Sequence, residues 1–190
     1  VIDVVGTGGD GVGTINISTA SAFVAASMGL KVAKHGNRAV SSKAGAADLV
    51  EAAGIPLDLS PASSAKLLER TGFCFLFAQK YHPAMRYVAP VRGALKNPTI
   101  FNLIGPLVNP APLSYQVLGV GKPELLDVVA KALASLGLKH ALVVHGSGTD
   151  EFAVHGPTEI REITQEGIAS FTLTPEELGI TPAPLSELVG

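Results

Sequence analysis

The 190-residue sequence contains no Trp and a single Cys, together with only three Tyr and seven Phe. Cys74 therefore cannot form a disulfide within the chain, and the apolar run 73–77 around it favours a buried core thiol. So few aromatic side chains leave little material for stacking nucleic-acid bases. The net charge of −2, with acidic and basic residues interspersed, shows no basic surface for nucleic acid. We therefore expect no nucleic-acid partner.

Several other signals are missing. No signal peptide is recognisable and no apolar run approaches the roughly 18 residues that cross a bilayer, so we expect no membrane span and a cytoplasmic setting. The histidines show no metal-site spacing with cysteine, which argues against zinc. A G-x-x-x-x-G-K-[ST] motif is absent, which argues against a nucleoside triphosphatase of that type. The 47% hydrophobic content instead indicates a globular chain able to bury a core as one domain.

The most informative stretch is residues 1–19. Val1–Val5 is apolar and β-rich, which predicts a buried strand. A glycine-rich loop follows, and then three good N-cap residues before an apolar helical run at 20–28: Asn16, Ser18 and Thr19. A strand, a glycine loop and a helix N-terminus together present free N–H groups to an anion. The stretch therefore predicts a site for a phosphate-bearing substrate.

Two other interpretations of this stretch stay open. The glycines could simply form a turn. The segment from Gly6 to Gly11 also matches G-x-G-x-x-G, which by itself is a weak dinucleotide signal. A dinucleotide site would need an acidic residue about twenty positions further on. Basic residues stand there instead, which argues against NAD: Lys31, Lys34, His35 and Arg38.

The rest of the chain alternates strand-length and helical segments. We expect strands at 31–34, 73–78, 99–103, 115–120 and 141–144, and helices at 44–53, 61–70, 82–95 and 123–136. This order predicts an α/β fold with a largely parallel central sheet and helices on both faces. Residues 159–163 and 169–172 flank a turn at 166–167 and predict an antiparallel hairpin near the C-terminus, followed by a short helix from Thr174.

Three polar loops, at 6–16, 35–42 and 145–151, should follow strands at the carboxyl edge of this sheet, where α/β proteins bind ligands. The adjacent carboxylates Asp150 and Glu151 either belong to a solvated loop or, opposite an anion site, hold Mg²⁺ together with substrate phosphates. His35 and His82 are the better site candidates among the histidines, whereas His145 and His155 are interpreted as ordinary loop residues.

Five motifs together resemble the anthranilate phosphoribosyltransferase family: GTGGD at 6–10, NIST at 16–19, KHGNR at 34–38 with SS at 41–42, FNLIGPLVNP at 101–110, and DE at 150–151. The resemblance implies transfer of phosphoribose from phosphoribosyl pyrophosphate (PRPP) to the amine of anthranilate, with release of pyrophosphate and dependence on Mg²⁺, in tryptophan biosynthesis. It also implies a homodimer. Residues 1–190 would then be a single PRPP-binding α/β domain, a fragment lacking an N-terminal helical domain and a C-terminal part.

Carried over position by position, the resemblance implies roles for individual residues. It implies that Mg²⁺ is held by Ser18, Asp150 and Glu151, and that anthranilate meets Gly6, Asn37 and Arg92, with His35 and His82 near its path. The remaining substrate contacts would come from Gly9, Asp10, Thr14, Asn16, Ile17, Ser18, Thr19, Lys34, His35, Gly36, Asn37, Arg38, Ala39, Val40, Ser41, Ser42 and Ala46, besides Gly6.

The sequence departs from the family at three of these positions or near them. Ala46 stands where the family often has a serine, which weakens one expected phosphate contact. Gln79 and Met85 stand where relatives often carry a proline and a tyrosine, so the anthranilate entrance is expected to differ. Two alternatives remain. One is a pyrimidine nucleoside phosphorylase, although no lysine-serine phosphate motif of that class is visible. The other is a nucleic-acid-binding relative of the family.

Overall fold

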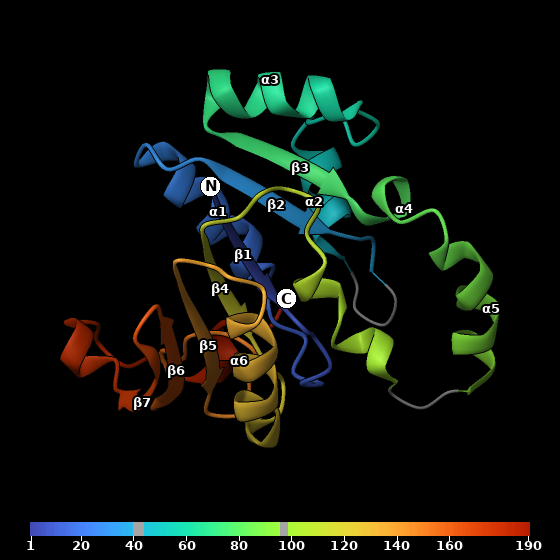
Figure 1. Cartoon of the computed structure of the whole chain (residues 1–190). Coiled ribbons are helices and arrows are strands. Elements are labelled where there is room, and N and C mark those ends of the chain that lie inside the picture. The colour runs from blue at the N-terminus through green and yellow to red at the C-terminus, as the bar shows by residue number, and fades with distance from the viewer. Residues whose placement is uncertain (40–43, 96–98) are drawn as a thin grey trace.

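The computed structural model describes residues 1–39, 44–95 and 99–190, and centres on a seven-stranded sheet in the order β3-β2-β1-β4-β5-β6-β7 (Figure 1). The strands are β1 Ile2–Gly6, β2 Val32–Gly36, β3 Phe73–Phe77, β4 Tyr115–Gly119, β5 His140–Gly146, β6 Thr158–Thr164 and β7 Gly167–Leu173. The first five run parallel, and β6 and β7 add an antiparallel hairpin at one edge. The predicted fold class is therefore confirmed.

Helices cover both faces of the sheet, and successive residues of β2 point toward opposite helix layers. Val32 packs with Ala22 of α1 (Ile17–Ser27) and Val50 of α2 (Ala46–Ala52). Ala33, one residue later, packs on the opposite face against Leu68 of α3 (Pro61–Thr71). This alternation follows from the two-residue period of a strand. It explains why successive residues of β2 are buried on both faces of the sheet.

The helix α6 (Leu126–Ala134) covers the other half of the sheet. Its Val129 and Leu133 pack with Leu118 of β4, Val143 of β5 and Ile163 of β6 in one buried cluster. By register, Leu118 shares the face of Ala33, so α6 lies on the same side of the sheet as α3. Burial of these aliphatic side chains contributes roughly 1.5–3 kcal/mol each and makes the sheet a rigid platform.

One predicted strand is wrong. The segment 99–103 is not a strand, because Asn102 Oδ1 accepts a hydrogen bond from the Thr99 N–H (2.9 Å) and closes a 3-10 turn at Ile100–Asn102. Both edges of β1 are in any case already paired with β2 and β4. The helix expected at 82–95 is confirmed apart from its first turn: it begins at Met85 as α5 (Met85–Leu95) and contains Pro90. A separate short helix, α4 (Ala78–Tyr81), precedes it.

Smaller differences concern helix ends. The helix expected at 123–136 starts with a 3-10 turn at Pro123–Leu125 before α6, and the helix from Thr174 is a 3-10 turn at Glu176–Leu178. Further 3-10 turns occupy Gly105–Leu107 and Leu185–Glu187. Among the described residues, none of the helices combines the length and apolar character needed to cross a bilayer.

Candidate functional site

The first and third polar loops meet at the carboxyl edge of the sheet, together with residues of α1 and β2. The N–H of Gly8, in the first loop, donates to Asp150 Oδ2 in the third loop at 2.6 Å. Ser18 Oγ, in the first turn of α1, donates to Glu151 Oε1 at 2.6 Å. Lys34, near the end of β2, interacts electrostatically with the same Glu151. Residues far apart in the sequence thereby form one polar cluster.

Glycines at the ends of three neighbouring strands make room for Asp150 and Glu151, which we call the acidic pair. A Cβ atom at Gly119 would lie 1.6 Å from the Asp150 carbonyl oxygen, and one at Gly6 would lie 2.2 Å from Asp150 Oδ2. A Cβ at Gly146 would lie 2.2 Å from the Glu151 carbonyl oxygen. These glycines are required by close approach of another chain segment. We call Gly6, Gly119 and Gly146 the glycine notch.

The acidic pair is held in an environment that disfavours its charges. Burial, with a contribution from the nearby Asp10, raises the pKa of Asp150 to about 6, although the Gly8 hydrogen bond opposes this shift. Burial likewise raises the pKa of Glu151 to about 7, with a contribution from Asp150, although the Ser18 hydrogen bond opposes this shift. Lys34 is itself buried, and burial lowers its pKa. Two partly desolvated carboxylates close together favour the approach of a cation.

The donor set fits Mg²⁺ shared with a substrate. Asp150, Glu151 and the Ser18 hydroxyl offer only oxygen atoms, which are the ligands that Mg²⁺ prefers. Within the part of the chain that the structure describes, no group of three or more His, Cys, Asp or Glu side chains forms a metal cage. Mg²⁺ is commonly bound by one or two carboxylates plus substrate phosphates, so this set suits an ion that arrives with its substrate.

The glycine loop and α1 supply N–H donors. Gly8 and Gly9 adopt φ angles of 66° and 81°, a region that side chains disfavour, and Asp10 Oδ1 accepts from the Val12 N–H at 3.1 Å. The helix α1 begins at Ile17 and has no acidic residue in its first turn. Asn16 stands at the N-cap position, although its side chain makes no capping hydrogen bond. Ser18 and Thr19, which the sequence also suggested as caps, lie inside the helix. This helix end is therefore suited to an anion.

Residues 13–15 join the loop to the far end of the chain. The backbone of Thr14 pairs with that of Val189, and the Ile15 N–H donates to the Leu188 carbonyl at 2.9 Å. The Gly190 N–H donates to the Gly13 carbonyl at 3.1 Å, which places the last residues beside the loop (Figure 1). Thr14 is thus fixed through its backbone.

Two candidate histidines contact each other. His35 Nε2 lies 3.1 Å from His82 Nε2, and the rings meet edge to face with centroids 5.0 Å apart. Burial lowers the pKa of His35 to about 4, and the neighbouring His82 lowers it further. Gln79 Nε2 donates to Asn37 Oδ1 at 3.3 Å, so one position that departs from the family directly contacts an expected anthranilate residue. The structure therefore brings together His35, Asn37, Gln79 and His82.

Other predicted residues are placed differently or not at all. Arg38 is engaged with α2, where its guanidinium pairs with Asp48 and Glu51. Ala39 donates its N–H to Asp48, Gly36 ends β2, and Ala46 is the first residue of α2. Val40, Ser41 and Ser42 lie outside the described residues. The helix α5 contains Arg92, but its side chain is also outside the described part.

The interpretation of His145 as an ordinary loop residue is wrong. This buried side chain lies on β5, its Nδ1 is 2.8 Å from the Val120 carbonyl oxygen, and its Nε2 accepts from the Gly148 N–H at 3.3 Å. It thus supports the turn that precedes Asp150. The only sequence signal for a buried His145 was the apolar strand that precedes it. Its contacts with Val120 and Gly148 could not be predicted, because they form only when the chain folds.

A buried polar network under the site was also missed. Asn109 Nδ2 donates to Asp3 Oδ2 at 2.8 Å and to the Ala33 carbonyl at 2.9 Å, and the His35 N–H donates to Asp3 Oδ1 at 3.3 Å. Asp3 is fully buried, and burial raises its pKa to about 6, although Lys34 and Asn109 oppose the shift. The network ties β1 and β2 to the turn after 105–107.

The Asp3 carboxyl should make stability depend on pH. Its pKa in the folded protein, about 6, lies above its ordinary value of 3.8, so ionisation is harder in the folded state. Stability contributed by the protonated form is therefore lost as the pH rises through the range between these two values. We compare the free energy of unfolding of the unsubstituted protein with that of Asp3→Asn, in which this group cannot ionise. The difference between the two should fall by on the order of 3 kcal/mol from acidic to neutral pH. Urea denaturation across this range measures it; a constant difference would contradict the prediction.

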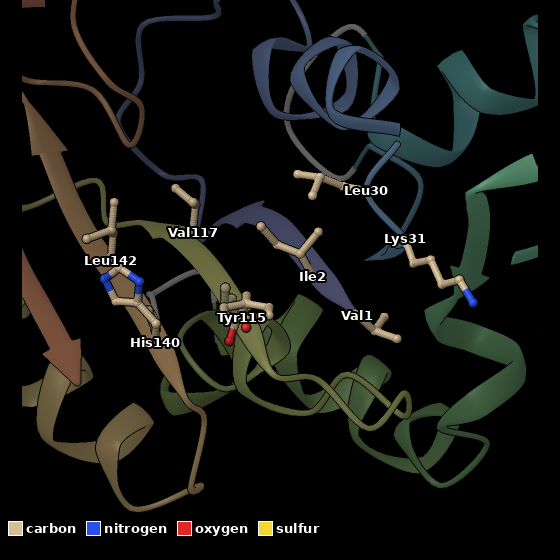
Figure 2. Close-up of a pocket in the computed structure, with 10 residues that line it drawn as sticks. Val1, Ile2, Leu30, Lys31, Tyr115, Val117, His140 and Leu142 are labelled. Atoms are coloured by element: carbon tan, nitrogen blue, oxygen red, sulfur yellow. The ribbon is translucent and has the colours of Figure 1, made fainter. Parts of the chain in front are cut away.

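A separate hollow lies on the sheet at the opposite ends of the strands (Figure 2). Its apolar wall includes Ile2, Leu30, Tyr115, Val117 and Leu142. These residues are at the amino ends of β1, β4 and β5 or just before β2, whereas the acidic pair and the glycine notch are at the carboxyl ends. The hollow is therefore not part of the candidate site.

Comparison with known proteins agrees with this geometry. A family model described as "Glycosyl transferase family, a/b domain" matches residues 1–190. The chain belongs to this family. It is 54% identical over 188 residues to an anthranilate phosphoribosyltransferase of Aeromonas hydrophila, covering 99% of this chain and 55% of that protein. The resemblance inferred from the five motifs is confirmed.

Solved structures of the family show the same fold. The crystal structure of anthranilate phosphoribosyltransferase from Thermus thermophilus superposes with a TM-score of 0.92 at 52% identity, covering 100% of this chain and 56% of the other. The Saccharomyces cerevisiae enzyme in complex with PRPP and Mg also gives a TM-score of 0.92, at 36% identity, with 100% and 52% coverage. A complex of the yeast enzyme with 4-fluoroanthranilate gives 0.88 at 34% identity, with 100% and 52% coverage. The chain spans about half the length of the relatives it matches.

Proposed function

We propose that the protein transfers phosphoribose from PRPP to the amine of anthranilate, releasing pyrophosphate, in tryptophan biosynthesis. The observation that carries the proposal is the contact of the glycine loop and α1 with the acidic pair, through Gly8 to Asp150 and Ser18 to Glu151. This arrangement places N–H donors and oxygen ligands for a cation side by side, as a pyrophosphate with Mg²⁺ requires. Family relatives that bind PRPP and Mg support it.

The geometry suits displacement of pyrophosphate from the ribose carbon. Ser18, Asp150 and Glu151 would hold Mg²⁺, which supplies positive charge at the leaving group. The N–H groups of the glycine loop and the start of α1 would hold the phosphates as negative charge builds there, a contribution of several kcal/mol in such sites. The amine of anthranilate is neutral near neutral pH, so it needs no strong base before attack. Holding it in line is the remaining task.

Anthranilate recognition is assigned to the second loop and α5. Asn37 and Gly6 lie at the ends of β2 and β1, on the same edge of the sheet as the acidic pair. Arg92 would grip the carboxylate as a two-pronged donor. The contact from Gln79 to Asn37 makes Gln79 part of the same region.

We propose further that residues 1–190 act as the PRPP-binding domain of a longer cytoplasmic polypeptide, which carries an N-terminal helical domain and a C-terminal part and forms a homodimer. The support is that two matched relatives named anthranilate phosphoribosyltransferase are nearly twice as long, since the chain covers 55% and 56% of them. The present chain should then bind PRPP but turn over little or nothing by itself.

Titration calorimetry with PRPP tests this function. The 190-residue chain should bind PRPP in the presence of Mg²⁺ and bind it at least about tenfold more weakly with EDTA, because the carboxylates would then face the pyrophosphate without a counter-ion. Loss of anthranilate fluorescence should report turnover of about 1 s⁻¹ or more from the full-length protein and far less from the isolated chain.

The same titration separates the alternatives. A pyrimidine nucleoside phosphorylase would cleave uridine or thymidine with inorganic phosphate and ignore PRPP. A nucleic-acid-binding relative would bind single-stranded DNA at physiological salt. Either result without PRPP binding contradicts the proposal, and full turnover by the isolated chain contradicts its assignment as a domain.

A further inference from the structure

The second loop is closed at its base by one carboxylate of α2. Asp48 Oδ2 accepts from the Ala39 N–H at 3.0 Å and from the Gly45 N–H at 2.8 Å. A single oxygen atom thus joins two backbone positions on either side of residues 40–43, which lie outside the described part. The Ala47 N–H also donates to the Asn37 carbonyl at 3.1 Å. The two arms of the loop are thereby held together at the start of α2.

The arms touch so closely that no side chain fits between them. A Cβ atom at Gly45 would lie 2.3 Å from the Ala39 nitrogen and 2.6 Å from the Arg38 carbonyl carbon. Neither arm can therefore move toward the other, and the Asp48 carboxylate prevents them from separating. The spacing of the loop base is fixed in both directions.

The second oxygen of Asp48 orients Arg38. Asp48 Oδ1 accepts from Arg38 Nη1 at 2.9 Å, and Glu51 accepts from Nη1 at 2.8 Å and from Nη2 at 3.0 Å. The guanidinium therefore binds α2, although its residue stands in the phosphate-binding motif. The backbone N–H bonds from Ala39 and Gly45, aided by Arg38, lower the pKa of Asp48 and keep this carboxylate charged.

We propose that Asp48 is a positioning residue for PRPP: it fixes the distance between Ala39 and Gly45 at the start of α2 without touching the substrate. The inference rests on the proposed function, because the loop carries residues assigned to PRPP. Its distinctive consequence is that the backbone contacts of Asp48 matter more than its charge.

Three variants of the full-length protein separate these contributions. Asp48→Ala removes both backbone contacts and should raise the KM for PRPP by at least about tenfold, since two hydrogen bonds to a charged acceptor are lost. Asp48→Asn retains one oxygen for Ala39 and Gly45, and its amide nitrogen loses the Arg38 hydrogen bond while Glu51 still holds the guanidinium. Its KM for PRPP should therefore stay within about threefold of the original. Glu51→Ala removes most of the Arg38 pairing but leaves the loop base intact, and serves as the matched control with an unchanged KM.

The comparison also distinguishes positioning from mere stabilisation of α2. The KM for anthranilate at saturating PRPP should change little in Asp48→Ala, although loss of the bond from the N-cap Gly45 N–H to Asp48 should lower the melting temperature. Equal losses for both substrates would overturn the inference, as would a KM for PRPP within about twofold of the original. Failure of the unsubstituted protein to bind PRPP would refute the proposed function itself and not this inference alone.

Discussion

Gly119→Ala is expected to reduce PRPP affinity in the presence of Mg²⁺ by on the order of a hundredfold, because no side chain fits at this position. The new Cβ would lie 1.6 Å from the Asp150 carbonyl oxygen and 2.4 Å from its carbonyl carbon. Both are backbone atoms, so a rotamer change cannot relieve the overlap. The turn that carries Asp150 and Glu151 must move away from the sheet.

Relief by movement of the strand is not available. Gly119 pairs with Gly6 of β1 on one side and with Val144 of β5 on the other, in the middle of the sheet. The variant should also lose roughly 1–3 kcal/mol of stability, which is typical of overpacking. Gly105→Ala is the matched control, because a Cβ at Gly105 meets no atom within 4 Å. Calorimetry should show that this control binds PRPP normally; normal binding by Gly119→Ala would mean that the turn is not part of the site.

Asp150→Asn combined with Glu151→Gln should lower turnover of the full-length protein by at least about tenfold, since both charged Mg²⁺ ligands are lost. The substitutions keep side-chain size, and an amide oxygen can still accept from the Gly8 N–H and the Ser18 hydroxyl. The loss should therefore be confined to function.

A second readout makes this prediction sharper. Burial raises the pKa of Asp150 to about 6 and that of Glu151 to about 7, so holding both charges above neutral pH costs folding free energy in the absence of metal. The double variant should therefore melt no lower than the original protein at about pH 8 in EDTA. Reduced turnover with an unchanged or higher melting temperature is the expected result. Retained turnover with the usual Mg²⁺ dependence would show that the pair does not bind the metal.

Local patterns in the sequence determined much of this protein. The apolar runs at β1, β3 and β5 and the turn between β6 and β7 specify strands through short-range periodicity and turn residues. Ser60, Pro61 and Gly72 delimit α3 as their cap chemistry requires, with the Ser60 hydroxyl accepting from the Ser63 N–H at 3.1 Å. The glycine loop and the motifs at 34–38 and 150–151 identified the family, because such spacing reflects chemistry at single loops.

Only the tertiary structure decided which residues meet. The Gly8 to Asp150 contact joins positions 142 residues apart, and Asn109 reaches Asp3 across 106 residues. Such pairs depend on strand order and register, which periodicity does not encode. The 99–103 segment has the apolar residues of a strand, yet in the fold it forms a 3-10 turn at Ile100–Asn102, closed by the Thr99 N–H donating to Asn102 Oδ1, and is not one of the strands of the sheet. Arg38 likewise carries the charge that a phosphate requires, yet folding brings Asp48 and Glu51 within hydrogen-bonding distance of it.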